Sequence, residues 1–437
     1  MKKYDTYKPS GVEWLGEIPE HWETLPIRAI FEERNEKNDG PKTDFILSVT
    51  KDRGVIPYNE KGAIGNNKSE DIERYKVVYE GDFVINKMNV VIGSLGMSKY
   101  FGAFSQVYLV YKPKSSKINI NYYSYIFSNP SFYKSLIRYC TGIMELRESL
   151  NKDDFKKIIL PLPEYNIQSK IVNFLDDKIN KIDQAILIKQ KQIELLKERR
   201  QILIHKAVNG GINSKVKFKF SGIDWIGEIP ENWKLLKINY FSKVGNGSTP
   251  SRENIKFWNE GKFPWLNSSS VNREIILDNN QFVTKRALKE CHLPILEKGT
   301  ILIAITGEGK TRGKAAICEI EATINQHLAY IKVDPKIAFN YFIMYVFHSM
   351  YNKLRADSSS QGSTKGAITC EAIKQIKIPI PPIQEQKQIV DFIETTTTKI
   401  DKAISLKEQE IEKLKEYKMS LIDGVVTGKL RVPQLER

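Results

Sequence analysis

Ser10 to Trp22 reads SGVEWLGEIPEHW, and Ser221 to Trp233 reads SGIDWIGEIPENW. Nine of these thirteen positions are identical, and the two segments lie 211 residues apart in a chain of 437. A period of this length is far longer than the roughly 20 to 50 residues of solenoid and propeller repeats. The chain is therefore predicted to contain two duplicated modules, each spanning about half of the sequence.

A second and longer repeat opens on a pair of prolines. Residues 161–210 align without gaps on residues 379–428, with 21 of 50 residues identical. Apolar residues recur in both copies with the 4-3 spacing of a coiled coil, whose seam faces a partner helix. The predicted seam residues are Leu175, Ile179, Ile182, Ile186, Ile193, Leu196, Leu203 and Ala207 in the first copy, and Ile393, Thr397, Ile400, Ile404, Ile411, Leu414, Leu421 and Val425 in the second.

Basic residues interrupt the two seams at equivalent positions. Lys189 matches Lys407, and Arg200 matches Lys418. Matched interruptions predict that the two helices pair with each other, and their common heptad phase suits an antiparallel pair. About 33 residues per helix would give a rod of roughly 50 Å. In such a pair, the N-terminal GEIPEHW would lie near the C-terminal helix.

The segments between the repeats diverge strongly. Residues 23–160 and 234–378 share a skeleton of short apolar runs bounded by Gly, Asn and Pro, which indicates strands and turns. An aromatic-rich helical stretch occurs at the same place in each copy, and its aromatic spacing favours core packing. The predicted fold class is α+β, with two duplicated α/β-mixed domains separated by two long antiparallel coiled-coil helices in a pseudo-two-fold arrangement. The expected boundaries are 1–160, 161–214, 215–378 and 379–437.

Charge and composition narrow the classes of partner. The net charge is +15, which favours a polyanionic partner, with nucleic acid first and an anionic membrane surface second. No apolar run approaches the roughly 20 residues that span a bilayer, and no signal peptide is evident. The four cysteines are far apart and form no CxxC motif, which suits a reducing compartment, so we expect a cytoplasmic protein without a membrane partner.

Two short motifs imitate catalytic chemistry. AITGEGKT at 304–311 fits a relaxed P-loop, but a P-loop must run directly into a helix, and here a strand-like run follows. NPSF at 129–132 is close to an adenine methyltransferase motif, but it lies within an aromatic helix hairpin. We expect a basic hairpin in the first case and an Asn-Pro turn in the second. The five histidines have no ligand-spaced partners, so no metal site and no catalytic residue are predicted.

The architecture resembles the specificity subunit of type I restriction–modification enzymes. The resemblance is carried by the two GEIPxxW segments and by PIPPIQEQKQIVDFIE at 379–394, and it covers essentially the whole chain. GNGSTPSRENIKFWNEGKFPWLNSSSV at 245–271 looks like the opening of one class of the family's target recognition domains, whereas KDRGVIPYNEKGAIG at 51–65 looks like another class. The first proline strand departs from the family pattern, because PLPEYNIQSK at 161–170 replaces the usual PLPPxxEQ.

The resemblance implies a non-catalytic DNA-binding subunit. Each target recognition domain would read one half of a bipartite, asymmetric target in double-stranded DNA. The helices would set the spacer between the halves and dock two methyltransferase (modification) subunits. These subunits would methylate adenine with S-adenosylmethionine, and further restriction/translocase subunits would use ATP and Mg. None of these cofactors is expected in this chain.

Polar and basic loop residues are the candidate DNA contacts. Arg and Lys suit phosphate or guanine edges, and Asn and Gln suit adenine. In the first copy the candidates are Lys51, Asp52, Arg53, Lys87, Asn89, Ser94, Thr141 and Arg147. In the second copy they are Ser248, Thr249, Ser251, Arg252, Asn267, Ser268, Ser269, Ser270, Lys310, Thr311, Arg312, Lys314, Gln361, Ser363, Thr364 and Lys365.

Two other classes of function remain open on the residues alone. One is a DNA methyltransferase or nuclease with its own recognition domains, which would need a cofactor loop or an acidic metal cluster. The other is a coiled-coil adaptor for acidic proteins without DNA specificity.

Overall fold

The computed structural model describes residues 1–40, 42–51, 53–62, 69, 71–141, 149–213, 215–307, 309–359 and 366–433. The chain forms two compact units, one of Met1–Lys189 with Glu408–Arg437 and one of Gln190–Lys407. Each unit therefore combines one mixed α/β domain with one half of each long helix.

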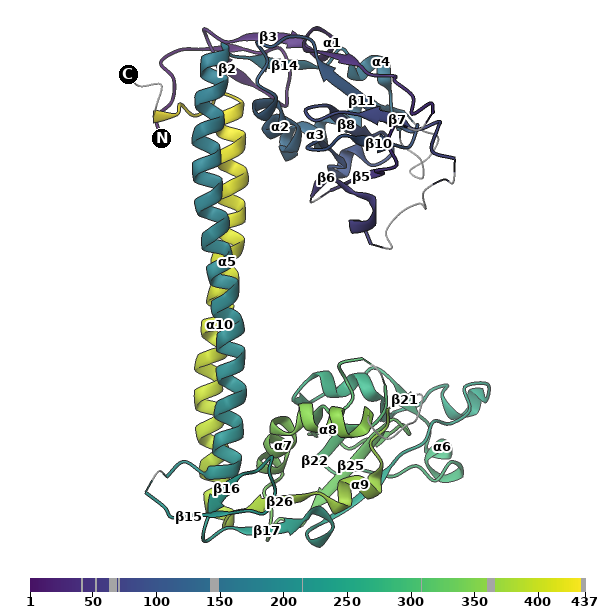
Figure 1. Ribbon diagram of the computed structural model, residues 1–437. Coiled ribbons are helices and arrows are strands. Elements are labelled where there is room, and N and C mark those ends of the chain that lie inside the picture. Colours follow the sequence, from purple (N-terminus) through teal and green to yellow (C-terminus); the bar gives the residue numbers. More distant parts are fainter. Residues whose placement is uncertain are drawn as a thin grey trace. The chain divides into compact units, whose positions relative to one another are not determined.

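The two long helices are α5 (Tyr165–Gly210) and α10 (Ile383–Val426), which Figure 1 draws as continuous ribbons. They contain 46 and 44 residues, so the expected length of about 33 residues was too short. The heptad count began where the seam begins, whereas the first turns of each helix pack into the core of a domain instead. Ile171 and Ile389 in these turns are fully buried.

Ion pairs show how the helices run within each unit. In the first unit, Nζ of Lys189 lies 2.6 Å from Oε2 of Glu410, and Lys418 contacts Asp183. Residue numbers thus rise along α5 as they fall along α10, which confirms the antiparallel pairing. In the second unit, Arg200 lies 3.5 Å from Asp401. Lys189, Arg200 and Lys418, which are basic interruptions of the seam, therefore form ion pairs with the facing helix.

Most of the predicted seam is buried. The buried members are Leu175, Ile179, Ile182, Ile193, Ala207, Ile393, Thr397, Ile400, Ile404, Ile411, Leu421 and Val425, and the half-buried ones are Ile186, Leu196, Leu203 and Leu414. Near the end of α5 the prediction was one residue off, because Ile204 is fully buried there and Leu203 is not. A helix of 3.6 residues per turn drifts from a strict seven-residue repeat. The last turn also packs against the second domain, in one core with Trp233.

The first domain is built around an antiparallel sheet in the order β4-β11-β8-β9. These strands are β4 (Phe31–Glu33), β11 (Tyr108–Pro113), β8 (Phe83–Asn86) and β9 (Leu95–Met97). The other strands are β1 (Tyr7–Pro9), β2 (Glu17–Pro19), β3 (Glu23–Pro26), β5 (Leu47–Thr50), β6 (Gly54–Pro57), β7 (Lys76–Val78), β10 (Gly102–Phe104), β12 (Cys140–Thr141), β13 (Ser149–Leu150) and β14 (Ile159–Leu162). The short helices are α1 (Ile27–Ile30), α2 (Ile120–Ser128), α3 (Pro130–Ser135) and α4 (Lys152–Phe155).

The second domain repeats this plan with the sheet order β18-β25-β22-β23-β20. These strands are β18 (Ser242–Asn246), β25 (Leu328–Val333), β22 (Thr300–Ala304), β23 (Ala315–Cys318) and β20 (Ile275–Ile276). The other strands are β15 (Phe218–Phe220), β16 (Glu228–Pro230), β17 (Lys234–Lys237), β19 (Phe263–Leu266), β21 (Phe282–Val283), β24 (Thr323–Ile324) and β26 (Lys377–Ile380). The short α-helices are α6 (Lys285–Glu290), α7 (Asn340–Ser349), α8 (Tyr351–Ser359) and α9 (Cys370–Gln375).

Comparison of the two domains explains the pattern of repeated and variable sequence. Both pair the strand after GEIPxxW with the proline strand, β3 with β14 and β17 with β26. They differ in the segments outside the shared sheet, which form the hairpin β5–β6 in the first domain and the sheet β21-β19-β24 in the second. The repeated sequence therefore builds the frame, and the divergent sequence builds the outer strands and loops.

The repeated tryptophans anchor each domain to the end of a helix. Trp22 is fully buried in one core with Leu421 and Val425 of α10, which confirms that the N-terminal GEIPEHW lies near the C-terminal helix. Gly428 has a φ of +77°, and a Cβ atom there would lie 2.4 Å from Pro19. Glycine at this position therefore lets the chain turn tightly against the GEIPEHW segment.

A repeated glutamine fastens the start of each helix to its domain. Nε2 of Gln168 donates to the carbonyl of Pro163 at 2.7 Å, and its Oε1 accepts from the backbone N–H of Asn119 at 2.9 Å. Gln386 donates to the carbonyl of Pro381 at 2.9 Å and accepts from the N–H of Phe339 at 2.7 Å. The departure of the first proline strand from the family pattern therefore leaves this contact intact.

The two segments that resemble catalytic motifs, AITGEGKT and NPSF, are parts of the fold. The described residues 309–318, which follow the relaxed P-loop pattern, lead into β23, a strand antiparallel to β22, and contain no helix where a P-loop requires one. Asn129 of NPSF caps α3 through the N–H of Ser131 and donates to Asp423 of α10 at 2.8 Å. Both structures agree with the predicted hairpin and turn.

Candidate DNA-binding surface

Loops of the second domain gather at one edge of its central sheet. β18 and β22 end at the level where β25 begins, because Asn246 pairs with Ala329 and Ala304 pairs with Leu328. The connections 247–249, 305–307 and 325–327 therefore meet at this edge. Ser248 and Thr249, predicted from the sequence, belong to this group and are half-buried.

Arg252 is held on two tryptophan rings. Its Cζ atom lies 3.7 Å from the ring centroid of Trp258 and 5.0 Å from that of Trp265, and its Nη2 donates to Gln281 at 3.1 Å. The tryptophans are fixed in turn, since Trp258 donates to the carbonyl of Ser251 at 2.9 Å and Trp265 to that of Ser248 at 3.2 Å. A guanidinium stacked in this way keeps its charge exposed while losing little freedom on binding a phosphate or base.

In the segment Asn267–Ser270 after β19, some residues hold the local fold and others are exposed. Asn267 caps the 3₁₀ helix Ser268–Asn272, because its Oδ1 accepts hydrogen bonds from both the N–H and the hydroxyl of Ser269. Ser269 is exposed, whereas Ser268 and Ser270 are half-buried. Asn267 therefore has a capping role that the sequence interpretation did not anticipate.

The basic hairpin between β22 and β23 presents some of its predicted residues and covers others. Lys310 is exposed, Thr311 and Lys314 are half-buried, and Lys314 donates to Asn272 at 2.9 Å. Arg312 was predicted as a DNA contact, but it is only 5% exposed, which leaves little of its side chain at the surface. Arg355 donates to the Arg312 carbonyl at 3.2 Å, which ties the backbone of this turn to α8.

A cavity of about 310 Å³ lies beside this hairpin. Arg200 of α5, Glu274, Lys310, Lys314 and His348 are among its lining residues. Arg200 donates to Glu274 at 2.8 Å, which ties α5 to the loop after the serine run. Burial lowers the pKa of His348, which contacts the carbonyl of Ala315 at 2.9 Å.

In the first domain the predicted residues are spread over several loops. Lys51 and Arg53 are exposed at the β5–β6 turn, and with Lys99 they line a cavity of about 540 Å³. Arg53 also forms an ion pair with Glu60. Lys87 is half-buried, and Asn89 and Thr141 are exposed. Ser94, also predicted as a DNA contact, is only 5% exposed, which leaves little of its side chain at the surface.

Several predicted residues lie outside the described part of the chain. These are Asp52, Arg147, Gln361, Ser363, Thr364 and Lys365.

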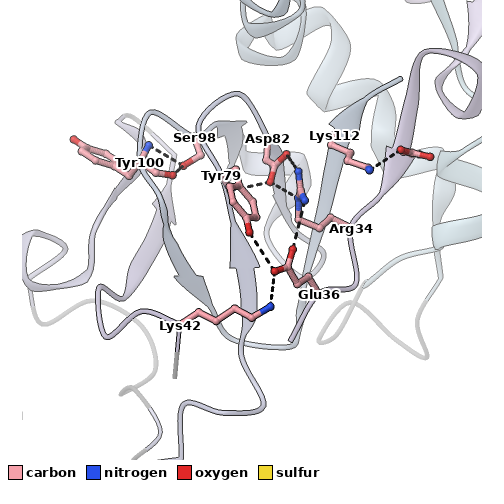
Figure 2. A network of polar contacts seen from close by, with 9 residues as sticks. Arg34, Glu36, Lys42, Tyr79, Asp82, Ser98, Tyr100 and Lys112 are labelled. Carbon is pink, nitrogen blue, oxygen red and sulfur yellow. Dashed lines mark hydrogen bonds and ion pairs between the residues drawn. The ribbon is translucent and has the colours of Figure 1, made fainter. Parts of the chain in front are cut away.

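A polar network holds the irregular segment after β4 against the start of β8 in the first domain (Figure 2). Arg34 donates to both carboxylate oxygens of Asp82, at 2.7 and 3.2 Å, and its Cζ atom lies 4.4 Å from the ring centroid of Tyr79. Glu36 accepts from Lys42 at 2.7 Å and from Tyr79 at 3.2 Å. Burial raises the pKa of Asp82, while the hydrogen bonds from Arg34 and from the N–H of Tyr79 oppose this shift. The network therefore runs from the buried carboxylate of Asp82 to the Lys42–Glu36 ion pair at the surface.

Sequence reasoning missed Gln326 and His327, which are exposed in the connection 325–327. The histidines were considered only as metal ligands, and Asn-Gln-His between two short strands has no distinctive pattern. The pairing of β25 with β22 and with β18 shows that this turn lies beside Thr306 and Thr249.

Other classes of site find little support in the described residues. Within that part of the chain, no group of three or more His, Cys, Asp or Glu could hold a metal ion. None of the helices described is both long and apolar enough to cross a membrane.

Comparison with known proteins places the chain in one family. The family model for the type I restriction modification DNA specificity domain matches twice, at residues 19–197 and 230–416. A putative type I restriction enzyme MjaX specificity subunit from Methanocaldococcus jannaschii is 27% identical over 434 residues, or 96% of each chain. The EcoR124I/EcoR124II specificity subunit of Escherichia coli is 24% identical over 291 residues, covering 63% of this chain and 65% of that relative.

Solved structures share the fold. The HsdS subunit from Thermoanaerobacter tengcongensis matches with a TM-score of 0.56 and 14% identity, covering 94% of this chain and 98% of that chain. A structure described as the basis of complex assembly and conformational transition of the type I R-M system gives a TM-score of 0.71 at 14% identity, covering 94% and 99%. With both of its modules matched, the chain belongs to the type I restriction–modification DNA specificity family, as a non-catalytic specificity subunit.

Proposed function

We propose that the two domains of this subunit read the two halves of a bipartite, asymmetric target in double-stranded DNA. The observation that carries the proposal is the contrast between frame and loops. The two domains share the order of four sheet strands and one attachment to the helices, yet differ in the other strands and loops. A common frame with different loops suits two readers of different sequences, because base readout depends on loop side chains. The net charge of +15 suits the phosphate backbone.

The helices are proposed to set the spacer between the half-targets. Each is continuous over more than 40 residues, and each contributes to both compact units. Ion pairs across the seam in both units oppose sliding of one helix along the other. A helix pair that resists sliding can act as a rigid spacer between the domains.

The helices are also proposed to dock two methyltransferase subunits. Ile188, Leu195 and Ile202 follow one another at seven-residue intervals on α5 and are 60%, 52% and 46% exposed. Such a stripe lies on one helix face and offers apolar contacts that the seam does not use. Methylation of adenine would then be supplied by these partners with S-adenosylmethionine. Restriction/translocase subunits would add ATP- and Mg-dependent cleavage, all in the cytoplasm.

The test is a methylome. The chain is expressed with its modification partner in a host without adenine methylation, and N6-methyladenine is mapped across the genome. We expect one bipartite motif with two different halves and a gap of fixed length. The modification partner alone should leave no motif.

A continuous motif in this experiment would contradict the proposal, as would an assembled complex that methylates nothing. A gel-shift assay with the chain and mixed genomic fragments then separates the alternatives. Absence of any DNA binding would favour an adaptor of acidic proteins.

A further inference from the structure

The turn before β25 presents two exposed polar side chains. Neither of these side chains makes the hydrogen bonds that fix the backbone of the turn. Asn325 is 4% exposed and fixes the turn, since its Oδ1 accepts from the N–H of His327 at 3.0 Å and its own N–H donates to the carbonyl of Leu266 at 3.0 Å. Gln326 and His327 are exposed beside it. Their side chains can therefore be exchanged without removing these bonds.

A chain of hydrogen bonds joins three loops through these residues. Thr249 Oγ1 donates to Oε1 of Gln326 at 2.5 Å, and Nε2 of Gln326 lies 3.3 Å from Nε2 of His327. Nδ1 of His327 lies 2.7 Å from Oγ1 of Thr306. The amide of Gln326 can donate to Nε2 only when the ring proton is on Nδ1, which then donates to Thr306. One tautomer thus satisfies every link.

These hydrogen bonds occupy only half of the hydrogen-bonding capacity of the Gln326 side-chain amide. Its amide has two N–H donors and an oxygen with two lone pairs, and among the described residues one donor and one lone pair are taken. One donor and one acceptor remain on the same planar group. Adenine offers the complementary pair in the major groove, an acceptor at N7 and a donor at N6. Both side-chain hydrogen bonds of Gln326 go to other side chains, so they orient the amide and do not support the backbone.

We propose that Gln326 reads an adenine in the half-target of the second domain, and that Thr249 and His327 are its positioning residues. The inference rests on the proposed function, because it needs a DNA half-target for this domain. Holding the amide in one orientation before binding lowers the entropy cost of making both hydrogen bonds. It also selects against bases that would leave the donor or the acceptor unpaired.

The test measures methylation by the complete methyltransferase complex on duplexes that carry single substitutions in the half-target of the second domain. Gln326→Ala should lose about tenfold of the discrimination at one A·T pair and leave the other positions unchanged. Gln326→Glu should shift the preference at that pair toward cytosine, whose N4 amino group is a donor. Thr249→Val should weaken the same discrimination, whereas Thr249→Ser, which keeps the hydroxyl group, should retain it.

Lys298→Ala is the matched control, because Lys298 is exposed at the opposite end of β22. This variant should leave the base discrimination unchanged at every position of the half-target. If Gln326→Ala and Gln326→Glu both leave every position unchanged while the parent complex methylates a bipartite target, the inference is wrong and the proposed function stands. A parent complex without a bipartite target would instead refute the proposed function. Thermal unfolding of each variant shows that it is folded, and the glutamate and Thr249 variants provide the test if the alanine variant is not.

Discussion

Lys418 of α10 donates two hydrogen bonds to the carboxylate of Asp183 on α5, at 2.7 Å and 2.8 Å. The 218-residue shift of the sequence repeat turns this pair into Arg200 and Asp401, which form an ion pair at 3.5 Å in the second unit. The repeat thus preserves a charged contact across the helix pair, and not only an apolar seam. Two such contacts fix the register in which the helices face each other.

Reversing one charge of this pair should weaken the helix pair. Lys418→Asp places two carboxylates opposite each other, and we expect a loss of about 1 kcal/mol of stability, as for other partly exposed pairs. Adding Asp183→Lys should recover most of that loss. Calorimetric unfolding of the full chain measures both, with Lys402→Asp at an exposed position of α10 as the control. A double variant no more stable than Lys418→Asp alone would show that the pair contributes nothing to the register.

The pair of half-buried Arg34 and buried Asp82 should contribute far more to stability than the neighbouring surface pair of Lys42 and Glu36. Asp82→Asn removes the buried carboxylate that holds Arg34, whose guanidinium then keeps only the longer contact to Glu36 at 3.6 Å. We expect a loss of about 3 kcal/mol, because Asp82 is only 2% exposed. Lys42→Ala removes an ion pair to Glu36 at the surface and should cost less than about 1 kcal/mol. Urea unfolding followed by the near-ultraviolet signal of the aromatic core compares the two variants. Equal effects would contradict the importance assigned to burial.

DNA affinity should depend on the stacked arginine of the second domain. Replacing Arg252 and Lys310 by alanine removes two exposed charges, so the slope of log K against log salt should fall by up to about 2. Arg252→Lys alone should also weaken binding, because lysine has no planar guanidinium that could stack on Trp258. Fluorescence anisotropy with target DNA over a salt series measures both effects. Lys336→Ala, an exposed change at the far end of β25, is the control, and unchanged affinity of the double variant would remove both residues from the interface.

The sequence predicted the frame well and the surface poorly, for physical reasons. Burial follows a periodic pattern, so Leu175 and its heptad successors could be read directly from the repeat. The exception at Ile204 arises where the helix begins to pack against a domain, whose position no heptad encodes. Tertiary packing also buries Arg312 and Ser94, which look like exposed loop residues in the sequence.

The residues at the sheet edge illustrate the same limit. Thr249, Thr306 and Gln326 are brought together by strand pairing across more than 70 residues of sequence. No local pattern contains that information. By contrast, Arg252 could be identified from the sequence as a basic loop residue, although its tryptophan partners could not.

Lengthening both helices by one heptad should lengthen the spacer of the DNA target. Insertions after Lys191 in α5 and after Gln409 in α10 lie between the two conserved ion pairs, so Asp183 would still face Lys418 and Arg200 would still face Asp401. Seven residues add about 10 Å at 1.5 Å per residue, or about three base pairs at 3.4 Å each. Methylome mapping should show unchanged half-sequences and a wider gap. The same insertion in α5 alone should disrupt the pairing, and a double-insertion variant that keeps the original gap would show that the helices do not measure DNA.

The central claim is that the two domains are independent readers, and a domain exchange measures this most directly. Residues 23–160 are replaced by the equivalent segment of another specificity subunit, and N6-methyladenine is mapped in cells that express the chimera with the modification partner. The account predicts a new sequence in one half of the motif, with the other half and the gap unchanged. A change in both halves together would contradict it.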